Sequence, residues 1–146
     1  MRISHDTLVL VADGRKSLFL RNEGDGEFLN LVVEDQRAHA DLEDRDLKSD
    51  APGRAMSQVG GRQSTMEEPD YHQLEEDRFA RETAELLARR VERGKVAELV
   101  VVAPPRTLGE LRRHYGKAVA ERIVAELDKD LVNHPIDRVE EALMAA

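Results

Sequence analysis

Three short apolar segments alternate with turn-forming residues at the start of the chain. Residues 7–12 (TLVLVA) are an almost continuous apolar run, which is typical of a strand buried on both faces of a sheet. The Asp13-Gly14 pair that follows favours a two-residue hairpin, because both positions of such a turn need positive φ. Residues 16–21 and 28–33, separated by a second turn cluster, predict the next two strands. The chain therefore opens with a predicted antiparallel meander.

The apolar periodicity stops at Glu34 and returns only after Pro69. Much of this stretch is acidic, with basic residues interspersed, and it shows neither a helical nor a strand period. Compact domains rarely keep so long a connection unless it has a function or tolerates disorder. We therefore predict a long mobile loop over residues 34–69.

A helical pattern of apolar residues follows Pro69. Asp70 is a suitable N-cap for this helix, and Gly94 is a suitable stop just beyond its C-terminus. Residues 99–103 (LVVVA) then predict a second fully apolar strand. Because the chain reaches this strand through a long helix, we expect a crossover onto a parallel neighbour.

The rest of the chain predicts three helices and one strand. Thr107 and Glu110 match a capping-box pattern at the start of a short helix. Residues 117–127 predict another helix, residues 129–133 a short last strand, and a closing helix follows Pro135. The predicted order is β-β-β-α-β-α-α-β-α, an α/β fold of ribonuclease-H-like type with a mixed five-stranded sheet.

Length and composition favour a single domain over residues 1–146. The 22 Lys and Arg residues face 30 Asp and Glu residues, and the net charge of −8 lacks the basic footprint of a typical nucleic-acid binder, so RNA binding would need a local basic patch. The absence of cysteine excludes disulfides and thiolate metal sites. No apolar run approaches the roughly 20 residues that span a bilayer, and no signal-type segment follows the N-terminus. We predict a cytoplasmic protein without membrane insertion.

The strongest candidate for a binding site is Gly60-Gly61-Arg62-Gln63, within the predicted loop. Adjacent glycines allow positive φ and close approach of another molecule, and the next residues carry a cation and an amide. With Arg62 inserted, this tetrapeptide resembles the Gly-Gly-Gln tip of the middle domain of archaeal and eukaryotic peptide-release factors. The resemblance implies a role for Gln63 at the ester bond of peptidyl-tRNA, as a candidate catalytic residue. Arg62 moves that glutamine relative to the glycines, and a plain flexible linker is the alternative interpretation.

Further motifs are spread almost from end to end. They comprise residues 8–14 (LVLVADG), 60–62 (GGR), 76–80 (EDRFA), 99–112 (LVVVAPPRTLGELR) and 126–131 (ELDKDL). Together they resemble the bacterial family called "protein required for attachment to host cells", and the segment around Ala103-Pro104-Pro105 discriminates best. The resemblance implies a fold related to the release-factor middle domain, while the family name describes a cellular phenotype and leaves the biochemistry open.

Arg106 and Thr107 form a second candidate site. They lie at the start of a predicted helix, where free backbone N–H groups and an arginine can bind a phosphate or carboxylate. The simpler interpretation is that Thr107 caps the helix and Arg106 is solvated or pairs with a carboxylate.

Metal and cofactor chemistry is not predicted. Asp13 is the only acid that closely follows the first strand, and its place in a turn already explains it. The next two strands offer no interior carboxylate for a two-metal centre. The five histidines show no zinc-like spacing, and no base lies near Ser64 or Thr65 to make a nucleophile.

Three functions fit these observations. The preferred one is a macromolecule-binding module whose Gly-Gly loop engages the ribosome or tRNA. The second is a peptidyl-tRNA or ester hydrolase in which Gln63 positions water, and the third is a protein that binds another protein and acts indirectly in cell attachment. The oligomeric state stays open. If segment 34–69 lies beside Arg106 in space, the two candidate sites form one.

Overall fold

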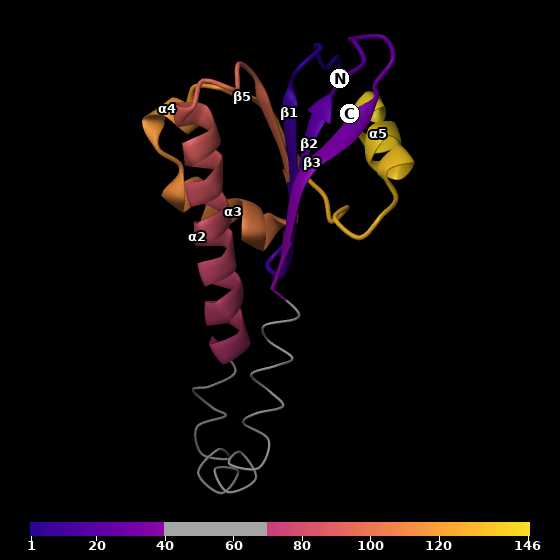
Figure 1. Cartoon of the computed structure of the whole chain (residues 1–146). Helices are drawn as coiled ribbons and strands as arrows, with labels where there is room; N and C mark the ends of the chain where they lie inside the picture. Colours follow the sequence, from indigo (N-terminus) through magenta and orange to yellow (C-terminus); the bar gives the residue numbers. More distant parts are fainter. Residues whose placement is uncertain (40–69) are drawn as a thin grey trace, which may run out of the picture.

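The computed structural model describes residues 1–39 and 70–146, which form one mixed five-stranded sheet with helices on both faces (Figure 1). The strands are β1 (Leu8–Ala12), β2 (Lys16–Asn22), β3 (Leu31–Ala38), β4 (Leu99–Ala103) and β5 (Ile123–Asp128). The helices are α2 (Asp70–Glu92), α3 (Pro105–His114), α4 (Lys117–Ala120) and α5 (Ile136–Ala145). Gly60, Gly61, Arg62 and Gln63 lie outside the described residues. None of these four helices is long and apolar enough to cross a membrane.

The strand order is β3-β2-β1-β4-β5, with β1 in the centre. β1 pairs antiparallel with β2 and parallel with β4, and β5 extends the parallel half. The predicted α/β class, the opening meander and the parallel crossover are therefore confirmed, and the strand order is compatible with a ribonuclease-H-like fold. β1 and β4 are buried along their whole length, as their apolar sequences predict.

Two hydrophobic cores lie on opposite faces of the sheet. In Figure 1, α2, α3 and α4 cover one face and α5 covers the other. Alternate residues of β1 divide between them: Leu8 and Leu10 enter the α2 core, while Val9 and Val11 enter the α5 core. This division explains why the central strands show no polar alternation.

The third strand starts later and is longer than predicted: β3 begins at Leu31, so the strand prediction is wrong for residues 28–30. β3 continues through Ala38, so the prediction that the chain becomes a mobile loop at Glu34 is wrong for residues 34–38. A β-bulge explains the error, because Phe19 pairs with Asp35 and Leu20 with Val33, which leaves Glu34 without a partner residue on β2. The bulge and the charged residues that follow it hide the period-two pattern.

The predicted helix over residues 117–127 and the strand over 129–133 are also wrong. α4 ends at Ala120, and residues 123–128 form β5 instead. Val119, Ile123 and Leu127 fit a helical period, but β4 presents a free edge whose backbone groups need partners. Residues 123–128 pair with that edge and therefore adopt the strand conformation. A bulge at Val124 sets the register of their pairing with β4. The predicted order of elements survives because a helix still precedes the last strand.

One turn and one helix end show how local residues determine the backbone conformation. The Asp13-Gly14 hairpin forms, but neither residue has positive φ; the Asp13 carboxylate instead accepts the backbone N–H groups of Arg15 and Lys16, both at 2.8 Å. Gly14 is needed for space, since a Cβ there would lie 2.6 Å from Cβ of Glu76 on α2. As predicted, Gly94 ends α2, with φ of +73°.

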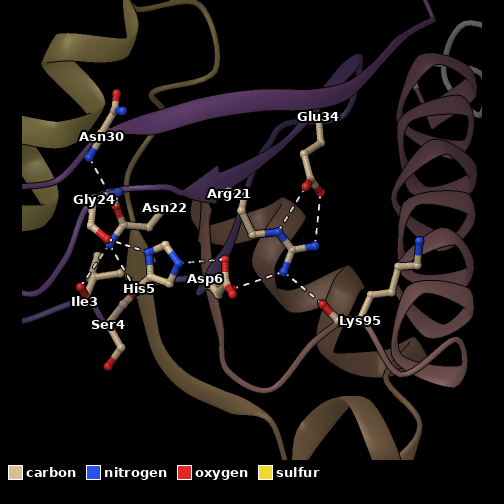
Figure 2. Close-up of polar contacts among 10 residues, drawn as sticks. All are labelled: Ile3, Ser4, His5, Asp6, Arg21, Asn22, Gly24, Asn30, Glu34 and Lys95. Carbon is tan, nitrogen blue, oxygen red and sulfur yellow. Dashed lines mark hydrogen bonds and ion pairs between the residues drawn. The ribbon is translucent and has the colours of Figure 1, made fainter.

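Asn22 fastens the N-terminal segment to the β2–β3 connection (Figure 2). Its buried amide nitrogen donates to the carbonyls of Ile3 and Ser4, each at 3.0 Å. Its amide oxygen accepts the backbone N–H groups of Gly24 at 2.9 Å and Asn30 at 3.1 Å. Two donors and two acceptor positions are thus all used, which is the full capacity of this side chain.

Asn22→Ala should lower the free energy of unfolding by about 2–4 kcal/mol, because it leaves several buried backbone groups without a partner. Asn30→Ala is the matched control: the Asn30 side chain is exposed and its backbone N–H is kept, so the expected change is within about 0.5 kcal/mol. Urea denaturation measures both. Equal stability of the two variants would contradict the structural role of Asn22.

Candidate functional site

The residues that flank segment 40–69 lie on the side of the domain where the turn between β1 and β2 is found. The backbone N–H of His39 donates to the carbonyl of Arg15 in that turn at 2.7 Å. α2, which begins at Asp70, approaches the same turn at Glu76, which packs against Gly14. Figure 1 shows β3 and α2 running toward this end of the sheet. Residues 39 and 70 therefore sit on one side of the domain.

Among the described residues, ion pairs and one histidine–carboxylate contact connect β3 and the residue that follows it to α2, and we call them the β3–α2 ladder. They are Glu34 and Asp35 with Arg90, Arg37 with Glu82, and His39 with Glu75. Residue numbers rise along β3 as they fall along α2, so the two elements are matched in antiparallel fashion. The Glu34–Arg90 contact is 2.8 Å and the His39–Glu75 contact is 3.5 Å. The ladder holds both flanks of segment 40–69 together.

Phe79 lies in the middle of the ladder. The Arg37 guanidinium stands 4.6 Å from the centre of its ring, a cation–π distance, and the His39 ring is 5.8 Å away. Phe79 is itself buried in the side of α2 that faces the sheet. The ladder thus combines charge pairing with contact to an aromatic side chain that water does not reach.

Arg21 anchors the other end of the ladder (Figure 2). Its guanidinium donates to both carboxylate oxygens of Glu34 at 3.1 Å, and to the carbonyls of Asp6 at 3.1 Å and Lys95 at 2.8 Å. The hydrogen bonds from Arg21 lower the pKa of Glu34, with Arg90 adding to the effect and partial burial opposing it. Glu34 is therefore a fixed negative charge between two arginines.

The bulge in β3 is what brings two carboxylates to this face. Neighbouring residues of a regular strand point to opposite faces. Here Glu34 contacts Arg21 and Arg90, and Asp35 also lies 3.9 Å from Arg90. Because the bulge shifts the register between these positions, both side chains reach the arginines on the α2 side.

The second predicted site, Arg106 and Thr107, lies in the first turn of α3. The predicted capping box is wrong, because the N-cap is Pro104, no side chain caps the helix, and Thr107 is buried. Pro104 and Pro105 explain this, since they lack N–H groups and their fixed φ suits the start of a helix. Arg106 is 65% exposed and its guanidinium lies 3.7 Å from the Asp77 carboxylate on α2, as the simpler interpretation expected.

Arg106 and the flanks of the segment meet on the same part of α2. Asp77 contacts Arg106, while Glu75, two residues earlier, contacts His39. Residues two apart lie on opposite flanks of a helix, so α2 stands between Arg106 and His39. The predicted second site and the flanks of the predicted loop thus adjoin one stretch of α2.

The described part of this site lies on both sides of segment 40–69. Within residues 1–39 and 70–146, no three His, Asp or Glu side chains are placed to hold a metal ion. The Asp13 carboxylate is occupied by its turn.

The residues of the ladder were not identified from the sequence. Glu34, Arg37 and His39 fall in the stretch predicted to be a loop, and no feature of the helical pattern distinguishes Arg90 from the other arginines of α2. One signal was available: the charge order along residues 34–39 is complementary to that of residues 75–90 read backward. Such complementarity gains meaning only once the two segments are known to be neighbours.

Two comparisons with known proteins bear on identity. The sequence model of bacterial archaeo-eukaryotic release factor family 12 matches residues 6–143, which include every strand of the sheet. Over 51 residues the chain is 37% identical to the uncharacterized protein RP470 of Rickettsia prowazekii (strain Madrid E). That match covers 35% of this chain and 34% of RP470, so the chain spans about a third of the relative's length.

Glu34→Gln should reduce stability at neutral pH and have little effect in acid. The pKa of Glu34 in the folded protein is below its ordinary 4.5, so its contribution is complete above that pH and is lost as the pH falls through the folded-state value. We expect a loss of about 1 kcal/mol at pH 7, since a third of the side chain stays in water. Denaturant unfolding between about pH 3 and 7 measures it.

Glu23→Gln is the control for this experiment, because the Glu23 side chain is exposed. Its curve of stability against pH should run parallel to that of the wild type. If the Glu34→Gln curve also ran parallel to the wild type down to the acid end, Glu34 would not be held in its charged form by the two arginines.

Proposed function

This chain belongs to bacterial archaeo-eukaryotic release factor family 12, and from that premise we propose that it is a binding module of the translation apparatus, which associates with the ribosome or with peptidyl-tRNA. The family match over nearly the whole chain is the observation that carries the proposal. The proposed contact element is Gly60-Gly61-Arg62-Gln63. The β3–α2 ladder supports this assignment because it ties down the residues on either side of the segment.

The geometry suits a presenting role. A segment whose two ends are fixed loses less freedom on binding than one with free ends, so more of its contact energy appears as affinity. Here one end follows His39, held by Glu75 and the β1–β2 turn, and the other enters the 23-residue helix α2. Arg106 stands beside the same helix as an exposed cation for a phosphate.

The residue types favour binding over hydrolysis. The glycine pair lets another molecule approach the bare backbone, and Arg62 and Gln63 offer a cation and an amide. A glutamine that positions water needs a fixed distance from its supporting glycines, and the inserted Arg62 changes that distance. Peptidyl-tRNA hydrolysis by Gln63 is the alternative function, and an assay of peptide release distinguishes it from binding alone.

The resemblance to the host-attachment family points to a cellular phenotype, attachment to host cells, but it does not indicate a molecular mechanism. A role in attachment through translation would be indirect, and it is part of this proposal only in that sense. A direct role would need a protein partner at the cell surface, and no feature of the described residues selects one.

Wild-type protein should pellet with ribosomes at moderate salt, and replacing Gly60, Gly61, Arg62 and Gln63 together by alanine should reduce the pelleted fraction about tenfold. The reason is that the variant removes both the close backbone approach and the phosphate-binding cation. Gln58→Ala, in the same segment but outside the tetrapeptide, is the control and should pellet as the wild type does. Failure of the wild type to pellet with both empty and stalled ribosomes would refute the association.

Peptide release is the second test. A binding module should release labelled peptide from peptidyl-tRNA no faster than buffer alone, and Gln63→Ala and Gly61→Ala should leave that rate unchanged. Release by the wild type that disappears in both variants would instead establish the hydrolase, with Gln63 as its catalytic residue.

A further inference from the structure

The charged residues of α2 are sorted by face. Three carboxylates, Glu75, Asp77 and Glu82, lie on the flanks of the helix and contact basic side chains of other elements. Arg90 also turns inward, to Glu34 and to the ring of Phe19. Three acidic side chains of α2 are therefore engaged with the rest of the domain.

The outward face carries the opposite charge. Four exposed arginines follow one another along it at helical spacing, and we call them the α2 arginine stripe: Arg78, Arg81, Arg89 and, just past the helix end, Arg93. Only two acids share this face, Glu85 and Glu92. The whole protein has a net charge of −8, so the positively charged stripe has the opposite sign to the protein as a whole.

The stripe arginines are nearly unpaired. Arg78 lies 3.8 Å from Glu75, but Arg81, Arg89 and Arg93 form no ion pair with any described residue. Glu85 sits one helical turn from both Arg81 and Arg89, at the spacing where ion pairs usually form, and pairs with neither. Elsewhere the arginines at positions 21, 37, 106, 112 and 113 contact a carboxylate, while those at positions 2, 122 and 138 form no ion pair with a described residue and are scattered over other elements.

Two large exposed side chains extend the stripe toward Asp70. Tyr71 is 58% exposed and Leu74 is 63% exposed, and both lie on the same side of α2 as Arg78. An exposed tyrosine next to arginines can stack on a base or pack against a ribose, and aromatic residues are otherwise scarce in this chain, at 3%.

We infer that the α2 arginine stripe is a contact surface for the sugar-phosphate backbone of a folded RNA, with Tyr71 at one end. Charge complementarity carries the inference: an acidic protein repels RNA as a whole, so RNA can approach only where unpaired cations gather. Arginine suits phosphate because its planar fork donates two hydrogen bonds at once. From Arg78 to Arg93 the stripe is about 22 Å long, enough to meet several phosphates. The inference rests on the proposed function. It assigns contact with RNA to a surface that is separate from Gly60-Gly61-Arg62-Gln63.

The test is equilibrium binding of fluorescently labelled tRNA at salt concentrations between about 50 and 200 mM. Arg81→Gln/Arg89→Gln should make the slope of log affinity against log salt shallower by about two, and should weaken binding roughly 10- to 60-fold near 0.1 M salt. Arg81→Lys/Arg89→Lys, which keeps both charges, should restore the slope.

Arg113→Gln/Arg138→Gln is the matched control, because it removes two exposed arginines from α3 and α5 and changes the net charge equally. It should keep the wild-type slope. Equal slopes for the stripe variant and this control would overturn the inference, as would failure of the wild type to bind tRNA.

Ribosome pelleting separates this inference from the proposed function. If the wild type and the stripe variant pellet equally and with the same salt dependence, the stripe does not contact ribosomal RNA. The protein then binds a protein surface of the ribosome, and the proposed function stands without the stripe inference. If the wild type does not pellet but binds tRNA through the stripe, the association with ribosomes fails and the stripe inference survives. Thermal unfolding of each variant checks that the fold is unchanged.

Discussion

The pairing of β3 with α2 is the constraint on which the other features of this domain depend. Apolar contacts place α2 on the sheet but do not fix β3, since most of β3 is exposed and three of its eight side chains are charged. Arg21 and Arg90 hold Glu34, Glu82 holds Arg37, and Glu75 holds His39. Because β3 precedes the segment 40–69 and α2 follows it, these ion pairs determine where that segment leaves the domain and where it returns.

Isolated surface ion pairs contribute little to stability, but this ladder differs in two respects. Arg21 is mostly buried and donates to two backbone carbonyls as well as to Glu34, so its hydrogen bonds are numerous and fixed. Arg37 and Arg90 each lie over an aromatic ring that is itself buried. Desolvation and multiple partners make such contacts stronger than exposed pairs.

The use of charge inside the domain shapes its outer surface. Glu82 and Asp77, which pair with Arg37 and Arg106, do not neutralise the arginines on the outer face of the same helix. An acidic chain can therefore carry a basic stripe without any excess of basic residues. Net charge does not reveal such a stripe because it sums over groups that the fold has already paired.

The sequence by itself determined the elements whose signal is local. The apolar runs of β1 and β4, the turn at Asp13 and the stop at Gly94 depend on burial or on nearby backbone geometry, and each was predicted at the right place. The candidate loop Gly60-Gly61-Arg62-Gln63 was also a local pattern, and it lies outside the described residues. Tertiary structure alone decided the rest. Residues 123–128 became a strand because β4 offered a free edge, and residues 34–38 became a strand because they pair with β2 beyond a bulge. Arg21 and Arg90, distant from Glu34 in sequence, neutralise its charge there. Contacts between residues far apart along the chain leave no periodic trace in it, and for that reason the base of the site could be seen only in the folded molecule.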